Sequence, residues 1–155
     1  MRKSISRFFY LNFMKNLQQY LTPAIKLGLI GAGVFGSKIK DFALACGVRK
    51  ENILLCDPPK SAEDAENLND ALHIEWGNGM GGCDFSRMET ETYLPLSELT
   101  RADVICIQIP ATPENAGAIG KEFLDRCKAD VRILCYSDPF VLAEDIRSDS
   151  RINNL

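Results

Sequence analysis

Three glycines in the segment GAGVFG have the spacing of a phosphate-binding turn. Gly31, Gly33 and Gly36 follow an apolar run and precede a segment with helical spacing. In such a turn the first glycine permits a tight change of direction, the second lets backbone approach a pyrophosphate, and the third allows close packing of helix on strand. Backbone N–H groups at a helix start are unpaired and donate to phosphate oxygens. The spacing therefore predicts a dinucleotide-binding turn.

An acidic residue stands where such a site needs one for the adenosine ribose. Asp57 follows Gly36 by about 20 positions, at the end of a second apolar run, ILLC. A carboxylate accepts hydrogen bonds from ribose hydroxyls and repels a 2′-phosphate, so we expect NAD to be preferred over NADP. The alternative is that Asp57 and Pro58 only open a turn.

The segments that must position these residues alternate between strand and helix patterns. Strands are predicted at 25–30, 52–56, 104–109 and 131–136, and helices at 34–46, 119–128 and 139–146, with Gly47 as a helix stop. A strand returns parallel to its neighbour only through a crossover, so this alternation predicts a doubly wound, mostly parallel α/β sheet of the Rossmann type. Polar, glycine-rich residues 60–92 are expected to form an elaborated loop with a short helix at 62–72.

The first 22 residues are expected to form a separate element. Phe9, Phe13, Leu17 and Leu21 recur every four residues, which predicts an amphipathic helix over 1–22, ahead of a dinucleotide-binding domain over 23–155. The sequence leaves two alternatives open for this apolar stripe. It packs on the domain of its own chain, or it packs on a partner chain, for example in a homodimer. Residues 1–40 carry seven basic side chains and no acidic one, so a targeting segment is a third interpretation.

The composition is that of an ordinary single globular domain. The chain has 155 residues, 46% of them hydrophobic and 25% charged, and no apolar run approaches the roughly 18 residues of a membrane span. The six cysteines form no C-x-x-C pair, and His73 has no cysteine within nine residues. We therefore expect free thiols in a cytoplasmic protein, no metal site, and neither a membrane nor a nucleic acid as partner.

Four segments together resemble the nucleotide-binding domain of the D-2-hydroxyacid dehydrogenases: KLGLIGAGVFGSKI, ILLCDPP, LSELTRADVICIQIPATPENAGAIGKEFL and ILCYSDPFVLAEDI. The resemblance covers about residues 25–146 apart from the 60–92 loop, and it implies NAD as cofactor. It also implies that the Val34 and Phe35 amides join the glycines around the pyrophosphate. Asp57 and Pro58 would border the adenosine ribose, and Ile109 and Pro110 would line the adenine and nicotinamide-ribose side.

The chain departs from this family where the chemistry is expected. Such enzymes usually carry a histidine two positions before the proline that ends the fourth strand, and here Gln108 stands there. Ser137 and Asp138 occupy the stretch that usually holds an arginine for the substrate carboxylate, and neither forms a bidentate fork with a carboxylate. The family's acid and base residues lie beyond the matched region, and His73 is not placed to replace them. We therefore predict no catalytic residue.

Three functions compete on these observations. The first is an NAD-binding module, related to these dehydrogenases but not catalytic as an isolated chain. The second is a small active NAD-dependent 2-hydroxyacid oxidoreductase, completed by dimerisation or a partner chain and capped by the 60–92 loop, with Trp76, Cys83 and Asp84 as candidate contacts. The third is a degenerate Rossmann-like interaction domain. The intact glycines and Asp57 argue against the third function, and the missing arginine and acid–base pair argue against the second, so the first is favoured.

Overall fold

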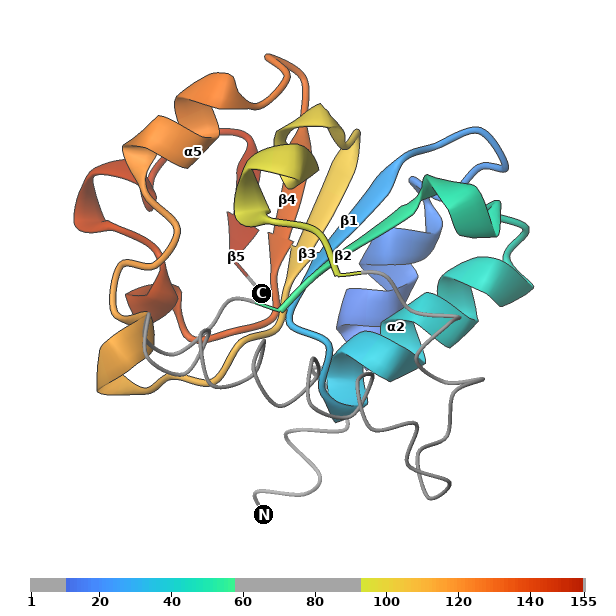
Figure 1. Cartoon of the computed structure of the whole chain (residues 1–155), viewed down its shortest axis with the longest axis horizontal. Helices are drawn as coiled ribbons and strands as arrows, with labels where there is room; N and C mark the ends of the chain where they lie inside the picture. Colours follow the sequence, from blue (N-terminus) through green and yellow to red (C-terminus); the bar gives the residue numbers. More distant parts are fainter. Residues whose placement is uncertain (1–10, 58–92, 155) are drawn as a thin grey trace, which may run out of the picture.

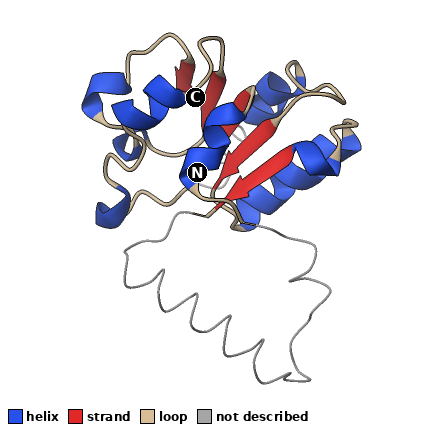
Figure 2. Ribbon diagram, turned by 45° about the horizontal axis from the view of Figure 1, so that its top comes forward, coloured by secondary structure: helices blue, strands red, loops and turns tan. Residues whose placement is uncertain are grey.

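A five-stranded parallel sheet forms the centre of the molecule. The computed structural model describes residues 11–57 and 93–154. Within them the strands are β1 (Leu27–Ile30), β2 (Ile53–Cys56), β3 (Val104–Ile107), β4 (Arg132–Cys135) and β5 (Ile152–Asn154). Their order across the sheet is β2-β1-β3-β4-β5, and every pair is parallel. Helices lie on both faces (Figures 1 and 2), which confirms the predicted doubly wound α/β fold.

The three central strands β1, β3 and β4, together with β2, are almost entirely apolar because both faces of the sheet are covered. One face meets the helix at residues 11–18 and α2 (Val34–Ala45), while the other meets α5 (Lys121–Arg126) and a 3-10 turn at Leu96–Arg101 (Figure 1). The first face buries Phe13, Leu17, Leu27, Leu29, Ile39, Ala43, Val104 and Leu134. The second buries Ile30, Leu54, Leu99, Ile105, Ile107, Phe123, Leu124 and Ile133.

Helix α2 ends at Ala45, two residues before Gly47, which the sequence predicts as the helix stop. Gly47 has a φ of +95°, a left-handed conformation that favours glycine. Its N–H donates to the Leu44 carbonyl, and the Val48 N–H donates to that of Ala43. This pair of bonds satisfies carbonyls of the last turn that would otherwise lack partners. The predicted end of the helix is thus confirmed.

The N-terminal helix packs on the sheet of its own chain. Phe13 and Leu17 are fully buried, and the Phe13 ring meets the edge of Tyr136, with centroids 5.1 Å apart. Tyr20 and Leu21 pack against the same cluster. Of the two alternatives for the apolar stripe, packing on the domain is therefore the one found for these residues. Phe9 lies outside the described residues, and the division at residues 22 and 23 stays a prediction.

Toward the C-terminal end, one predicted helix is wrong and one strand was not predicted. Residues 139–146 form two 3-10 turns, Pro139–Val141 and Glu144–Ile146, instead of one helix. Between them Leu142 and Ala143 are extended because they pair with Ile119, whose carbonyl accepts from the Ala143 N–H. Strand β5 was not predicted, since Ile152 is its one apolar residue. The strand predicted to reach residue 109 ends at Ile107.

Among the described residues, no helix is long and apolar enough to cross a membrane. The predicted loop at 60–92, the helix at 62–72, Pro58, His73, Trp76, Cys83 and Asp84 lie outside the part of the chain that the structure describes.

Candidate dinucleotide site

The carboxyl ends of three strands lie level at one edge of the sheet. In the strand register, Ile30 at the end of β1 pairs with Cys56 at the end of β2 and with Ile107 at the end of β3. Helix α2, which follows β1, packs on one face of the sheet, whereas the 3-10 turn Leu96–Arg101, which precedes β3, packs on the opposite face. In open α/β sheets such a switch point between the faces is where ligands bind. The glycine turn, Asp57 and the segment after β3 all start from this edge.

Each glycine of the turn has a different steric environment. Gly31 has a φ of +108°, and a Cβ there would approach the Gln108 carbonyl oxygen to 2.6 Å. A Cβ on Gly36 would overlap the carbonyl oxygen of Gly31, so α2 packs directly on the turn. Gly33 has a negative φ of −71°, and apart from its chain neighbours no described residue lies within 4 Å of the position its Cβ would take. The motif therefore combines two constrained glycines with one that faces open space.

The first turn of α2 presents its backbone to that space. Gly33 is the N-cap residue and makes no side-chain cap hydrogen bond, and the first turn contains no acidic residue. The first N–H groups of an α-helix lack intrahelical acceptors, and the helix dipole favours an anion beside them. Val34 is 71% exposed and Phe35 39% exposed, so apolar side chains flank these amides. This arrangement suits a phosphate group.

Asp57 reaches the glycine turn from the neighbouring strand. Its Oδ1 accepts a long hydrogen bond, 3.5 Å, from the Ala32 N–H. The side chain is exposed, as a residue that binds a ribose from solvent must be. The structure therefore brings together Asp57 and the three glycines, although 25 positions separate Asp57 from Ala32.

The segment after β3 is fixed by two side chains whose role the sequence did not reveal. The Ser137 hydroxyl accepts from the Ile109 N–H at 2.7 Å and donates to the Ile109 carbonyl at 2.8 Å. Asn115, which is 5% exposed, donates to the Pro110 carbonyl at 2.8 Å. Ile109 is buried and Pro110 is exposed. Asparagine is common in turns because its side chain bonds nearby backbone, but this local preference does not identify Pro110 as the partner.

Gln108 lies beneath the turn. Its Nε2 donates to the Gly31 carbonyl at 2.7 Å, and its backbone N–H donates to Ile30 at 3.0 Å. The sequence identified Gln108 only as a departure from a family pattern. Its contact with the glycine turn spans 77 positions and follows from the pairing of β1 with β3.

The thiols at this edge are poor nucleophiles. Burial, together with the charge of Asp57, raises the pKa of the Cys56 thiol to about 11. Burial likewise raises the pKa of Cys135 to about 11, and its thiol donates a hydrogen bond to the Ser137 carbonyl. The five cysteines within the described residues are free, and four of them are buried. These findings agree with the expected free thiols and assign no covalent chemistry to them.

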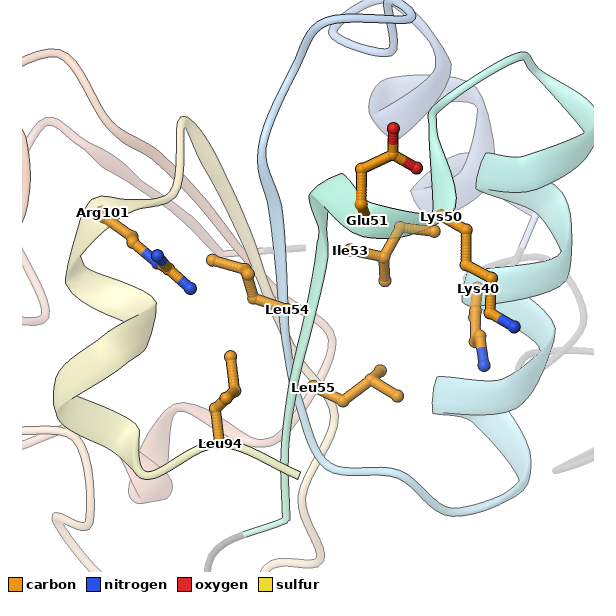
Figure 3. Close-up of a pocket in the computed structure, with 8 residues that line it drawn as sticks. All are labelled: Lys40, Lys50, Glu51, Ile53, Leu54, Leu55, Leu94 and Arg101. Carbon is orange, nitrogen blue, oxygen red and sulfur yellow. The ribbon is translucent and has the colours of Figure 1, made fainter. Parts of the chain in front are cut away.

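A cavity of about 420 Å³ lies elsewhere, along the outer edge of β2 (Figure 3). Leu54, Leu55 and Leu94 form its apolar part, and Lys40 and Arg101 approach from opposite sides. None of the described residues that line it belongs to the glycine turn. The cavity is therefore distinct from the predicted dinucleotide site, which is an open surface at the ends of the strands.

Comparison with curated proteins finds relatives of one kind. The chain is 32% identical over 111 residues to erythronate-4-phosphate dehydrogenase of Porphyromonas gingivalis, covering 68% of this chain and 22% of that protein. It is 31% identical over 119 residues to D-3-phosphoglycerate dehydrogenase of Synechocystis, covering 77% of this chain and 17% of that protein. The chain thus spans about a fifth of the length of these relatives. No family model matches it.

Solved structures share the fold. A D-lactate dehydrogenase from Aquifex aeolicus, solved with NAD and lactic acid, superposes with a TM-score of 0.55 at 20% identity, covering 92% of this chain and 41% of the other. A D-isomer-specific 2-hydroxyacid dehydrogenase from Lactobacillus delbrueckii, solved with NAD, gives 0.54 at 13% identity, covering 90% and 40%. Together with the sequence relatives, they confirm the predicted relationship to one part of such dehydrogenases.

Proposed function

We propose that this chain, a relative of the D-2-hydroxyacid dehydrogenases, is an NAD-binding module that is not catalytic as an isolated chain. The observation that carries the proposal is the meeting of Gly33, the first backbone amides of α2, and the Asp57 carboxylate at one switch point of the sheet. Backbone amides at a helix start bind a pyrophosphate, and a nearby carboxylate binds the adenosine ribose, so this arrangement matches two neighbouring groups of an adenine dinucleotide.

The residues proposed to hold NAD are Gly31, Gly33, Val34, Phe35, Gly36, Asp57, Pro58, Ile109 and Pro110. The turn and the first amides of α2 would accept the pyrophosphate, and Asp57 the adenosine ribose. Ile109 and Pro110 would contact the adenine and nicotinamide-ribose side, on a segment held rigid by Ser137 and Asn115. Bound NAD supplies a hydride acceptor; the chain's own residues bind and orient it.

Calorimetric titration with NADH, NADPH and ADP-ribose tests the proposal. NADH and ADP-ribose should bind, and NADPH should bind more weakly because its 2′-phosphate meets Asp57. Absence of binding by all three would contradict the proposed function. NADPH binding as tight as that of NADH would contradict the role of Asp57 alone.

Two substitutions of Asp57 separate its charge from its contact with Ala32. Asp57→Ala should weaken NADH binding, because each hydrogen bond to a charged group contributes about 1.5 to 3 kcal/mol. Asp57→Asn keeps an acceptor for the Ala32 N–H but removes the charge, so its loss of NADH affinity should come with a relative gain for NADPH. Asp41→Ala, at an exposed position of α2, is the matched control and should leave both affinities unchanged.

A further inference from the structure

One peptide group of the glycine turn is held at both ends by side chains. The peptide between Gly31 and Ala32 presents its carbonyl oxygen to Gln108 Nε2 at 2.7 Å and its N–H to Asp57 Oδ1 at 3.5 Å. The two contacts come from the ends of β3 and β2, on opposite sides of β1. The shorter bond belongs to Gln108, so that residue holds the peptide more firmly.

We propose that Gln108 is a positioning residue of the dinucleotide site, fixing the Gly31 carbonyl so that the following amides, from Gly33 to Phe35, face the ligand. The inference rests on the proposed function and deepens it. Gln108 does not have to touch the ligand, because the peptide it holds comes two residues before the N-cap of α2. Rotating that peptide would turn the amides that follow it.

The packing around the carbonyl leaves little room for another arrangement. The Gly31 oxygen lies between Gln108 Nε2 and the backbone of Gly36, where even a Cβ would overlap it. On its other side, Gly31 faces the Gln108 backbone oxygen. Gly31 is therefore confined by Gln108 and Gly36, and Gln108 Nε2 donates a hydrogen bond to its carbonyl oxygen.

The orientation of the Gln108 amide is determined by this contact. The Nε2 group must face Gly31, because the opposite orientation would place two acceptor oxygens against each other. Its Oε1 is buried and has no hydrogen-bond partner among the described residues. Leaving a buried acceptor unpaired is unfavourable. The Gln108 amide thus makes its hydrogen bond to the Gly31 carbonyl although its own oxygen is left without a partner among the described residues.

Three substitutions distinguish a donor from mere filling of space. Gln108→Met removes the donor at similar volume, Gln108→Glu places an acceptor opposite the Gly31 oxygen, and Gln108→His restores one N–H donor. We expect Met to weaken NADH and ADP-ribose binding by up to about tenfold, the upper end for one neutral hydrogen bond, and Glu to weaken it more. Histidine should recover most of the affinity. Adenosine, which has no pyrophosphate, should bind all variants alike.

The matched control is Thr112→Val, in the same loop after β3. The Thr112 hydroxyl is also buried without a hydrogen-bond partner among the described residues, so, unlike Gln108, its side chain makes no hydrogen bond to the turn there. This variant should bind NADH and adenosine as the wild type does. If Gln108 only stabilised the fold, its variants would instead weaken NADH and adenosine by the same factor, and this result would overturn the proposal.

A measurement without ligand separates this inference from the proposed function. NMR order parameters of the Ala32 to Phe35 amides should fall in Gln108→Met and Gln108→Glu and stay unchanged in Thr112→Val. If wild-type protein does not bind NADH, the proposed function fails. Unchanged order parameters in both Gln108 variants would overturn the positioning role, whatever the affinity of the wild type.

Discussion

Gly33 and Gly36 belong to one motif, but they differ in how they tolerate a side chain. The backbone of Gly33 has a φ open to any residue, and the position of its Cβ is clear of neighbours. At Gly36 a Cβ would overlap the Gly31 carbonyl oxygen, which is backbone and cannot swing away. Gly33 thus leaves space that the proposed ligand could enter, whereas Gly36 allows the close contact between α2 and the turn.

This difference predicts opposite outcomes for two substitutions. Gly33→Val should unfold at nearly the wild-type temperature but lose NADH binding, because its branched side chain occupies the space before the α2 amides. Gly36→Ala should lower the melting temperature, since overpacking typically costs about 1 to 3 kcal/mol. Thermal unfolding and calorimetry on both variants check this. Normal NADH binding by Gly33→Val would contradict a role of the GAGVFG segment in binding the dinucleotide.

At the residue scale, the sequence predicted what depends on local spacing. The steric roles of Gly31 and Gly36 follow from the motif itself, and the geometry confirms them. The contacts of Gln108 and Ser137 were not predicted, because their partners lie 77 and 28 positions away. Such pairs become neighbours only once the order and register of the strands are known. The binding roles of the predicted residues remain predictions.

At the scale of elements, Asp103 joins the amino ends of three strands. Its carboxylate accepts from the Lys26 N–H at 3.0 Å and from Lys128 Nζ at 2.6 Å. Its backbone N–H donates to the Lys26 carbonyl, and its carbonyl accepts from Arg132 at the start of β4. Burial alone would raise the pKa of this carboxyl, but the hydrogen bonds from Lys128 and Lys26 outweigh it and hold the pKa below its usual value.

The lowered pKa of Asp103 predicts how stability depends on pH. A carboxyl whose pKa is lower in the folded state stabilises the fold above its unfolded pKa of about 3.9, and this contribution is lost as pH falls through the folded value. Asp103→Asn should therefore lower the free energy of unfolding at pH 7 by about 1 kcal/mol or less, given the solvent exposure of the pair. The difference should shrink below about pH 4.

Urea unfolding of both proteins at pH 7 and pH 3 measures this difference, with the exposed Asp130→Asn as control. An equal difference at the two pH values would contradict the electrostatic interpretation.

The elements themselves were predictable where periodicity was strong. The four apolar runs became β1 to β4, and helix α2 began at Val34 as its pattern indicated. The helix predicted at 139–146 failed because Leu142 pairs with Ile119, a tertiary contact that overrides local helical spacing. Strand β5 has almost no apolar signal. Its start is instead fixed by Arg151, which bonds Asp149 at 3.0 Å and reaches the Leu124 carbonyl.

For the whole molecule, the N-terminal helix is part of the core. Phe13→Ala should lower the free energy of unfolding by about 3 to 5 kcal/mol, because it removes a fully buried aromatic ring that contacts Tyr136. Leu11→Ala, at a position 57% exposed on the same helix, should have little effect. Chemical denaturation measures both. If Phe13→Ala left the stability unchanged but altered the oligomeric state, the apolar stripe of the N-terminal helix would be assigned to contact with a partner chain.

The last prediction concerns catalysis by the whole chain. Oxidation of a 2-hydroxy acid requires a fixed cation for the carboxylate and a base beside the hydroxyl that loses its proton. Ser137 stands where the related enzymes are expected to carry that cation, but its hydroxyl is engaged on both sides with the Ile109 backbone. Gln108 stands where a histidine is expected, and its one donor group is bound to Gly31. Neither residue supplies the missing chemistry.

We therefore expect the purified chain to turn over 2-hydroxy and 2-oxo acids, erythronate 4-phosphate included, far below the roughly 1 s⁻¹ of slow ordinary enzymes. Ser137→Arg should not restore activity, because a base would still be lacking, and it should lower stability, since both hydrogen bonds to Ile109 are lost. NADH absorbance across a panel of such acids, with thermal unfolding of the variant, checks both expectations. Turnover at about 1 s⁻¹ or faster would contradict a non-catalytic module and show that other residues of this chain supply the cation and the base.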